Sequence, residues 1–431
     1  MWREFKDTLR NLSARDGAIA LVLRGLRSLA RRGRGCLQVL TDLWFVATCG
    51  RSDLPKFNEH LNRLECRLGR TRLRSYPPIV GFALSNYCNQ RCRFCALDMK
   101  HVERRVLLPA GSFERIKWLR FVREIWLSGA AGDSLVHPEF AGIVAAVRRV
   151  APKSRLMLCT NGLALKGPNL EATDELDYIN VSANAASEAT YAALIKGGSF
   201  RQLMANLEGL ARRKRPSAAV HLSMVLARSA VDDVEPMIDL AARLRFDAVE
   251  VYRYFPIPPG DGALPLSEST NEEPEIWERV RGLAAYARQR GVGYLVAGEP
   301  LAPCRSFNTV IQYRGIRGCH APWSNGHISI GPSGQTAFSV CCSGVSLNLC
   351  VGDSAYADFR RVWNSQRMQE VRRTVNRPDD QQNDMCWLCR RFERADFGSK
   401  RELRELANRV RPEIRFTDSD DPIAFATETV G

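Results

Sequence analysis

Residues 79–95 read IVGFALSNYCNQRCRFC, an apolar stretch followed directly by a loop with three cysteines. The apolar part, Ile79–Leu84, predicts a buried β-strand. Cys88, Cys92 and Cys95 follow with Cys-x3-Cys-x2-Cys spacing. Three thiolates on one tight loop can hold three irons of a [4Fe-4S] cluster, which is usually closed by four cysteines. The fourth iron is then left for a ligand from outside the protein. The alternative interpretation of the three cysteines is a loop that binds zinc.

Apolar strands alternate with helical patterns from Ile79 onward, which predicts an α/β fold built from parallel β/α units. The predicted strands cover 79–84, 124–127, 155–159, 178–182, 219–226 and 249–255. Helical patterns lie between or after them, at 112–122, 138–150, 200–212, 234–244 and 276–291. Six such units make a partial (β/α)6 TIM-like barrel, in which ligands bind at the carboxyl ends of the strands. The cysteine loop follows the first strand and is therefore expected at that face.

The cysteine loop resembles the signature of the radical S-adenosylmethionine (SAM) enzymes, which has an aromatic residue where Phe94 stands. The resemblance implies a [4Fe-4S] cluster whose open iron binds SAM through its amino and carboxylate groups. After the second predicted strand, residues 127–140 read LSGAAGDSLVHPEF and resemble the family's SGGEPLxHPxF segment. This implies that Gly132 and Asp133 receive the SAM amino group, with Asp133 in place of the usual Glu and Ser134 in place of the usual Pro.

Two more strand ends resemble the SAM site of this family. Residues 160–162 read TNG, like a turn at the family's barrel mouth, and the fourth strand ends at Ser182 ahead of a GGSF run at 197–200. The resemblance implies that Asn161 and Ser182 belong to the SAM site, with Ser182 at the ribose. Tyr252 and Arg253 are weaker candidates for the pocket, and no catalytic acid or base is assigned. The predicted cofactor-binding residues are Phe94, Gly132, Asp133, Asn161 and Ser182.

A second group of seven cysteines lies between residues 304 and 389. The order CHAPW from Cys319, the Cys341–Cys342 pair, VWN at 362–364 and a final Cys-x2-Cys resembles the twitch/SPASM domain of radical SAM enzymes. The resemblance implies one auxiliary [4Fe-4S] cluster in the shorter twitch form, since no cysteine follows Cys389. The expected ligands are Cys319, Cys341 or Cys342, Cys386 and Cys389. Four thiolates could equally hold zinc.

The chain is basic, and its charge is unevenly placed. The 431 residues carry a formal net charge of +15, and residues 1–75 carry +9 of it, with 16 Lys/Arg and seven Asp/Glu. Apolar residues at helical spacing between Ile19 and Leu29 predict one helix there, and a second is predicted around 37–47. Such a region packs on the main domain or makes peripheral contact with a membrane. No zinc-finger, helix-turn-helix or RNA-binding signature accompanies the charge, so nucleic acid is not an expected partner.

A chain of this length is expected to form more than one domain. The predicted organisation is a basic helical N-terminal region at 1–75, a radical SAM core at 76–300, a twitch/SPASM-like auxiliary cluster domain at 301–395 and a C-terminal tail at 396–431. The sequence has no secretory signal and no apolar stretch of the ~20 residues that span a bilayer, so we expect a cytoplasmic protein. Clustered cysteines in that reducing compartment indicate metal ligands and not disulfides.

Together these patterns indicate a radical SAM oxidoreductase. In that family a reduced cluster cleaves SAM to a 5′-deoxyadenosyl radical, which abstracts hydrogen from a substrate C–H bond in an oxidation or an epimerisation. A small polar or carbohydrate-like metabolite is the expected substrate, because residues 1–75 lack the strands of a leader-peptide-binding domain. A maturase of a ribosomally made peptide is the first alternative, and a non-catalytic iron–sulfur electron carrier is the second. The expected protein partner is an electron donor such as flavodoxin or ferredoxin.

Overall fold

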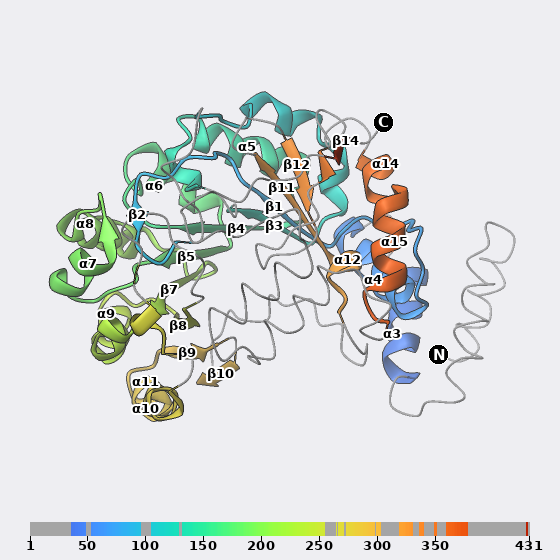
Figure 1. Cartoon of the computed structure of the whole chain (residues 1–431). Coiled ribbons are helices and arrows are strands. Elements are labelled where there is room, and N and C mark those ends of the chain that lie inside the picture. Colours follow the sequence, from blue (N-terminus) through green and yellow to red (C-terminus); the bar gives the residue numbers. More distant parts are fainter. Residues whose placement is uncertain are drawn as a thin grey trace, which may run out of the picture.

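The computed structural model describes residues 36–48, 53–95, 105–128, 132–254, 264, 266–270, 273–297, 299–302, 319–330, 336–339, 349–350, 359–377 and 428–429. Across these ranges the protein is built on one twelve-stranded sheet with helices packed around it (Figure 1). The helix predicted between Ile19 and Leu29 lies outside the described residues. No helix within the described ranges is long and apolar enough to cross a membrane.

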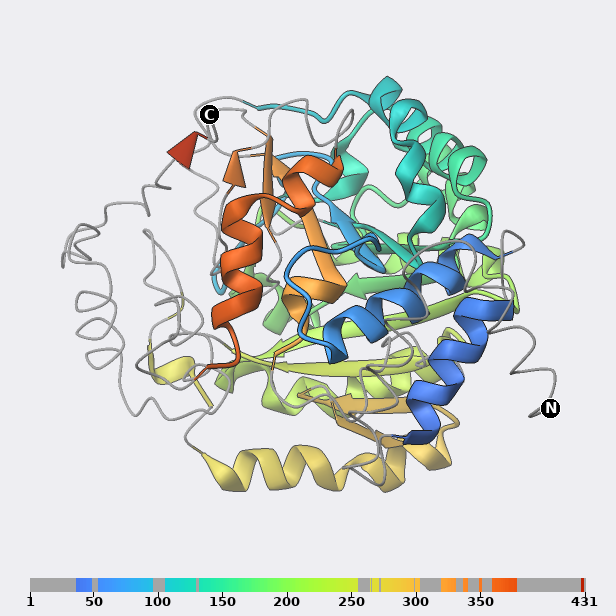
Figure 2. The ribbon, with the colours of Figure 1, turned by 90° about the vertical axis from the view of Figure 1, so that its right-hand side faces the viewer.

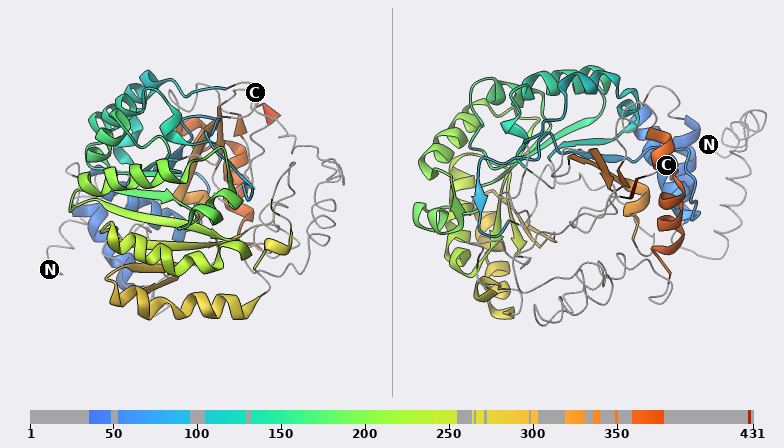
Figure 3. Two further views of the ribbon diagram at one scale, coloured as in Figure 1. Left: turned by 90° about the vertical axis from the view of Figure 1, so that its left-hand side faces the viewer. Right: turned by 45° about the horizontal axis from the view of Figure 1, so that its top comes forward.

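Six parallel strands form the centre of the sheet and correspond to the six predicted strands. They are β1 (Ile79–Phe82), β3 (Glu124–Leu127), β4 (Arg155–Thr160), β5 (Tyr178–Ser182), β7 (Ala219–Leu226) and β8 (Ala248–Arg253). Their order is β8-β7-β5-β4-β3-β1, and every neighbouring pair is parallel. The sheet curves, and helices line its convex side (Figure 3). The prediction of an α/β fold with a mostly parallel sheet is confirmed.

Further strands extend both edges of this sheet. β9 (Gly293–Val296) joins β8 in parallel, and β10 (Glu299–Ala302) runs antiparallel to β9. At the other edge β11 (Asn325–Ile330) lies parallel to β1, and β12 (Thr336–Ser339) returns antiparallel to it. This edge ends with two short strands, β13 (Leu349–Cys350) and β14 (Glu428–Thr429). The described strands after residue 319 therefore continue the barrel sheet.

The two faces of the sheet differ in chemistry. The convex face packs against α5 (Phe140–Val150), α8 (Phe200–Arg213) and α9 (Val234–Arg243), and it presents fully buried aliphatic side chains such as Val181 and Leu222. Because side chains alternate along a strand, the intervening residues of β5 and β7 face the concave side. These residues are polar: Tyr178, Asn180, Ser182, His221 and Ser223. The helices therefore pack on the apolar, convex face, and the polar, concave face carries side chains that can bind a ligand.

One predicted helix has a different form. Residues 112–122 form two 3₁₀ helices, η2 (Ala110–Arg115) and η3 (Lys117–Phe121), instead of one α-helix. Fully buried residues recur here at every third position: Phe113, Ile116, Leu119 and Val122. That spacing suits the three residues per turn of a 3₁₀ helix better than the 3.6 of an α-helix.

The remaining short elements connect the strands. The helix predicted at 276–291 is interrupted at Leu283, which separates α10 (Pro274–Gly282) from α11 (Ala284–Gln289). The other α-helices in the described barrel are α6 (Pro168–Glu171) and α7 (Glu188–Leu194). Single 3₁₀ turns occur at η4 (Ser134–Val136), η5 (Ala172–Glu175), η6 (Arg228–Asp233) and η7 (Leu266–Glu268).

Two N-terminal helices are held together by a buried charge cluster. α3 (Cys36–Thr48) carries Asp42, which is fully buried. α4 (Leu54–Arg67) supplies Arg63 and Arg67, and each guanidinium lies 2.8 Å from a carboxylate oxygen of Asp42. Breaking one partner of such a buried set leaves an uncompensated charge, so this cluster fixes the angle between the two helices.

Of these two helices, α4 packs with the chain that follows it against the C-terminal segment (Figure 2). Asn62 of α4 donates to the backbone oxygen of Trp323, in α12 (Ala321–Ser324), at 2.7 Å. α14 (Phe359–Trp363) and α15 (Gln366–Thr374) lie beside them, and the Trp363 indole donates to Ser75 O at 3.0 Å. The described parts of the two regions are therefore in direct contact, and the predicted domain boundaries stay predictions.

Candidate functional site

The cysteine loop lies at the carboxyl end of β1. A short antiparallel ladder fixes it, in which β2 (Arg91–Cys92) pairs with β6 (Ile195–Lys196). Cys88 and Cys92 are half-buried, and Cys95 is exposed. Phe94 is half-buried and packs against the hydrophobic core. One side of the loop is therefore anchored in the core while its last thiol faces outward.

The environment of the loop favours neutral thiols. Burial raises the pKa of Cys88 to about 11, and the hydrogen bond from Gln90 N to Sγ at 3.4 Å opposes this only in part. Burial also raises the pKa of Cys92 strongly, and charge on Cys95 or Cys88 would raise it further. The three sulfurs therefore lie close enough to influence one another's ionisation. Metal ligation requires thiolates, so a metal bound here must displace these protons.

The GGSF run at 197–200 supports the cysteine loop. Gln90 donates through Nε2 to the Tyr191 hydroxyl at 2.6 Å, and this contact is buried. A Cβ at Gly198 would lie 2.5 Å from the same hydroxyl. Glycine at this position therefore leaves room for Tyr191. Through its contact with Gln90, Tyr191 holds the loop between the first two cysteines.

Gly132 packs directly against the chain that leads into the cysteine loop. Its φ is +79°, and a Cβ there would lie 2.4 Å from Tyr87 O and 2.6 Å from Ser85 O. A side chain would therefore push apart the loops that follow β1 and β3, and glycine is also suited to this φ. The structure gives Gly132 a role in bringing these two loops together.

Asp133 ties the loop after β3 to the end of β4. Its buried carboxylate accepts hydrogen bonds from Thr160 Oγ1 at 2.9 Å, Asn161 N at 2.7 Å and Leu135 N at 2.9 Å. Burial raises the pKa of Asp133 even though these donors favour the charged form. These contacts are to the protein itself, so the structure shows Asp133 positioning Asn161. Its predicted contact with the SAM amino group stays a prediction.

Asn161 reaches from the turn after β4 to the cysteine loop. Its Nδ2 donates to Asn89 Oδ1 at 2.6 Å and to Cys88 Sγ at 3.5 Å. The next residue, Gly162, has a φ of +79° that allows the tight turn. Two predicted segments that lie 73 residues apart in the sequence therefore meet at one point.

Ser182 ends β5 beside this point and lies next to Cys159 of β4, with 3.8 Å between Oγ and Sγ. Ser223 also donates to Ser182 Oγ, at 3.4 Å. The Cys159 thiol contacts the Ser182 hydroxyl, and Cys159 belongs to none of the hydrophobic clusters. Burial raises the pKa of Cys159 to about 11, so the thiol is protonated at neutral pH.

A polar network lies on the concave face, and of its members the sequence had indicated only Tyr252 as a weaker pocket candidate. Glu250 of β8 lies at its centre and accepts from Tyr178 at 2.7 Å and from the Tyr252 hydroxyl. His221 Nδ1 lies 2.5 Å from Glu250 Oε1, and Asn180 donates to the Tyr178 hydroxyl at 3.3 Å. The alternation of polar residues along 178–182, 219–223 and 248–252 was the sequence signal that could have revealed it.

The network holds one ionised carboxylate among neutral hydroxyls. Burial by itself would raise the pKa of Glu250, but the hydrogen bond and charge of His221, with the Tyr252 and Tyr178 hydroxyls, hold it below its ordinary value. Burial and the charge of Glu250 raise the pKa of both tyrosines. The Tyr252 residue is 42% exposed, so the network is accessible from one side. Arg253 instead stacks over the Trp277 ring at 4.7 Å, which is a structural contact.

Cys319 is described among the predicted auxiliary ligands, and it is half-buried. Its backbone N donates to Asn376 Oδ1 at 2.7 Å, and Asn376 Nδ2 donates to Cys319 O at 2.9 Å. These bonds fix Cys319 against the chain just after α15. The other predicted ligands lie outside the described residues: Cys341, Cys342, Cys386 and Cys389. The auxiliary cluster therefore stays a prediction.

The donor set of the cysteine loop fits an iron–sulfur cluster. Among the described residues, no three His, Cys, Asp or Glu side chains converge as ligands of a single metal ion. A [4Fe-4S] cluster makes a different demand, because each protein thiolate binds its own iron. Three thiols on one anchored loop, with the Asn161 amide beside the first of them, meet this demand.

Curated proteins match the barrel part of the chain. Residues 82–241 match the family model of the Radical SAM superfamily. The GTP 3′,8-cyclase of Paenarthrobacter nicotinovorans is 30% identical over 164 residues, which cover 36% of this chain and 45% of that protein. GTP 3′,8-cyclase 2 of Mycobacterium tuberculosis is 26% identical over 171 residues, which cover 38% and 45%. The chain thus spans less than half the length of these relatives.

Solved structures resemble more of the chain. Streptococcus suis SuiB bound to precursor peptide SuiA is 16% identical with a TM-score of 0.56, over 76% of this chain and 74% of that chain. SuiB bound to SAM is 17% identical with a TM-score of 0.55, over 74% and 73%. At these identities the likeness concerns the fold. The strand order, and the strand ends that meet the cysteine loop, agree with the match of residues 82–241 to the Radical SAM superfamily.

Proposed function

We propose that this protein is a radical SAM enzyme that acts on a polar substrate held at the concave face of its barrel. The proposal rests mainly on one observation: the Asn161 amide donates hydrogen bonds to both Asn89 Oδ1 and Cys88 Sγ. It joins the cysteine loop to the turn after β4, at the strand ends where ligands of parallel α/β barrels bind.

In this proposal each residue has a defined task. Cys88, Cys92 and Cys95 hold the [4Fe-4S] cluster, and Gly132 allows the neighbouring loop to approach it. When bound, the reduced cluster and SAM supply a 5′-deoxyadenosyl radical that abstracts hydrogen from an unactivated C–H bond. Asp133 fixes the turn that carries Asn161, and Ser182 binds the SAM ribose. These residues orient the reactants and exclude water, which matters more than acid–base action for hydrogen abstraction.

The concave face supports a small polar or carbohydrate-like substrate. Ser223 and Asn180 are hydrogen-bonded to each other at 2.6 Å, and the ionised Glu250 holds the exposed Tyr252. Hydroxyls, an amide and a carboxylate on this face favour a polar ligand, because an apolar ligand would remove water from these groups without pairing with them. Oxidation or epimerisation of such a substrate is the reaction we favour.

Maturation of a ribosomally made peptide is the second candidate function. The fold shared with SuiB favours this function. The structure of SuiB with a precursor peptide matches 76% of this chain and 74% of the SuiB chain. The names of the curated relatives add cyclisation of a nucleotide as a further reaction type. A mass shift in a peptide encoded near this gene, dependent on the Cys88 loop, would favour the maturase over the small-molecule enzyme.

We also infer an auxiliary [4Fe-4S] cluster held by Cys319, Cys341 or Cys342, Cys386 and Cys389, with zinc as the alternative metal. A reduced flavodoxin or ferredoxin would supply electrons to the protein, and a cytoplasmic location would suit both the clusters and this donor. Of these four ligand positions, the structure describes only Cys319, whose backbone is held by the Asn376 side chain.

The proposal is tested by following SAM cleavage. The anaerobically reconstituted full chain, given dithionite and SAM, is expected to form 5′-deoxyadenosine, detected by mass spectrometry. Cys92→Ala should abolish the product, whereas Cys36→Ala, at the start of α3, should retain it. Product formation would remove the electron-carrier alternative. Equal product from wild type and Cys92→Ala, or none from an iron-loaded wild type, would contradict the proposal.

A further inference from the structure

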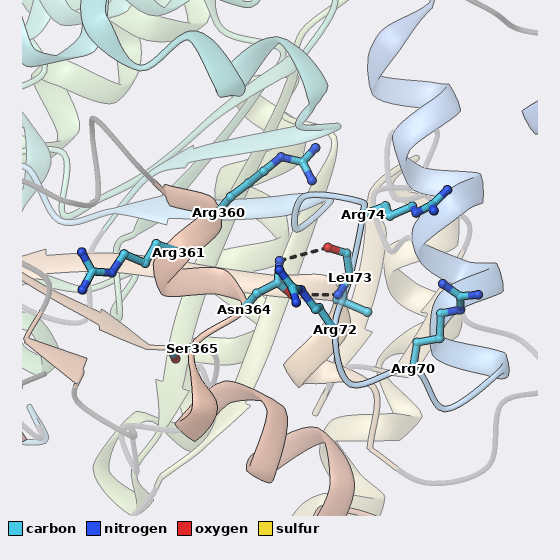
Figure 4. Close-up of a pocket in the computed structure, with 8 residues that line it drawn as sticks. All are labelled: Arg70, Arg72, Leu73, Arg74, Arg360, Arg361, Asn364 and Ser365. Carbon is cyan, nitrogen blue, oxygen red and sulfur yellow. Dashed lines mark hydrogen bonds between the residues drawn. The ribbon is translucent and has the colours of Figure 1, made fainter. Parts of the chain in front are cut away.

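A cavity of about 680 Å³ opens between the segment that precedes β1 and helix α14 (Figure 4). Five arginines line it: Arg70, Arg72, Arg74, Arg360 and Arg361. The other described residues that line it are neutral, and none of the described lining residues is acidic. Residues almost 300 positions apart in the sequence thus build one strongly cationic hollow, apart from the site described above.

The cavity has a firm base. Leu73 N donates to Asn364 Oδ1 at 2.7 Å, and Asn364 Nδ2 donates back to Leu73 O at 3.0 Å (Figure 4). Arg360 donates through Nε to the Tyr76 hydroxyl at 3.0 Å, and its guanidinium lies 4.5 Å from the centroid of the Tyr76 ring. The backbone under the arginines is therefore fixed before any ligand arrives, which lowers the entropy lost on binding.

Most of the positive charge in this cavity is not balanced by a carboxylate of the described residues. Within the described part of the chain, Arg70, Arg72, Arg74 and Arg360 form no ion pair with a carboxylate. Glu65 lies nearby, but its oxygens accept from Arg74 N at 2.8 Å and from the Ser75 hydroxyl at 2.6 Å. Cations gathered in this way repel one another, and a bound anion relieves the repulsion.

The position of the cavity separates it from the SAM site. Arg74 precedes β1, so the cavity lies toward the amino end of that strand, whereas Cys88 follows its carboxyl end. None of the residues that line the cavity belongs to the cysteine loop. A ligand here would instead join the N-terminal segment to the C-terminal helices, because the arginines come from both (Figure 4).

From this geometry we infer a second, non-catalytic binding site for a small ligand that carries two or more phosphate groups. Arginine is the residue of choice for phosphate, because its planar fork donates two parallel hydrogen bonds. One phosphate cannot satisfy the four guanidinium groups that form no ion pair with a described carboxylate, so a chain of phosphates fits better than a single one. The volume is that of a small-molecule pocket, which favours such a ligand over the surface of an acidic protein.

Calorimetric titration of the reconstituted full chain with inorganic tripolyphosphate tests this site. We expect one saturable site per chain, at least tenfold weaker binding of inorganic phosphate, and a higher melting temperature with ligand. ATP and GTP are titrated in parallel to show the source of the phosphates. Tighter binding of a nucleotide would mean that the base is also recognised, and equal binding would mean that the phosphates alone are; both results support the site.

The matched variants separate a site from general charge attraction. Arg72→Glu/Arg74→Glu leaves the Arg360–Tyr76 contact intact and should weaken tripolyphosphate binding at least tenfold. Arg201→Glu/Arg212→Glu changes the charge equally on exposed positions of α8 and should have little effect. The inference is overturned if tripolyphosphate does not bind, if both variants lose affinity alike, or if only an acidic protein binds. SAM cleavage is measured on the same samples, so failure here is distinguished from failure of the proposed enzyme.

Discussion

The two ends of β1 carry opposite kinds of polar chemistry. At the carboxyl end, polar groups are buried and satisfy one another, as Asp133 does with Thr160 and Asn161. At the amino end, Arg72 and Arg74 are exposed and have no carboxylate partner among the described residues. The first arrangement fixes geometry before a cofactor binds, which is the demand of a catalytic site. The second leaves charge for a ligand to neutralise, which suits recognition of an anion.

The largest expected effect comes from removing the buried carboxylate at the carboxyl end. Asp133→Ala leaves the Thr160 hydroxyl and the backbone N–H groups of Asn161 and Leu135 without their acceptor. We expect a loss of about 3–5 kcal/mol in the free energy of unfolding, measured by urea denaturation. Asp232→Ala is the control, since this exposed carboxylate pairs with Arg279 at the surface, where such pairs contribute little. A loss below about 1 kcal/mol for Asp133→Ala would refute the positioning role.

The concave face provides the next largest effect, with a defined pH dependence. The pKa of Glu250 is lowered in the folded state, so its contribution is present above the ordinary carboxyl pKa and is lost as the pH falls through the folded value. Glu250→Gln should therefore cost about 2–3 kcal/mol at pH 7. The difference from wild type should shrink below about pH 4. Unfolding curves at pH 7 and pH 3.5 that show the same difference would argue against an ionised Glu250.

An opposite pH dependence is expected at the amino end of β3. Burial raises the pKa of Glu124 to about 7, although Arg155 at 3.7 Å opposes the shift. A raised carboxyl pKa means that the folded state binds the extra proton, so stability falls as the pH rises from about 4.5 to 7. Glu124→Gln should flatten this slope and be more stable than wild type at pH 8, by up to about 3 kcal/mol. Melting temperatures between pH 5 and pH 8 test this, and a parallel slope in both proteins would contradict it.

The smallest effect is expected at the arginine cavity. Arg72→Ala removes an exposed side chain with no ion pair among the described residues, so the free energy of unfolding should change by no more than about 0.5 kcal/mol. If the arginines repel one another, 1 M salt should stabilise wild type slightly more than the variant, because it screens that repulsion. A loss above about 1 kcal/mol in urea denaturation would mean that Arg72 is structural.

Most of the barrel could be predicted because its strands carry strong local signals. The bounds of Glu124–Leu127, Tyr178–Ser182 and Ala219–Leu226 were predicted to the residue. In each of them the apolar residues that face the helices are buried, so composition and burial agree. The predicted helix at 112–122 was wrong in type, since burial at every third residue favours 3₁₀ geometry.

The site could be predicted only in part. The motif around Cys88 located the cysteine loop and the turn at Asn161, because each is a local pattern. The network around Glu250 was missed apart from Tyr252, since it depends on which face of three neighbouring strands each residue occupies. The arginine cavity could not be predicted, because Arg72 and Arg360 are brought together only by long-range packing.

The central claim is that the Cys88 loop holds a cluster independent of the C-terminal cysteines. Iron and sulfide are measured per chain after anaerobic reconstitution, for wild type and for Cys88→Ala/Cys92→Ala/Cys95→Ala. We predict about eight irons in wild type and about four in the variant, as two four-iron clusters require. Equal iron in both proteins would contradict the claim. About four irons falling to none, with zinc retained, would keep the SAM cluster and replace the auxiliary cluster with a zinc site.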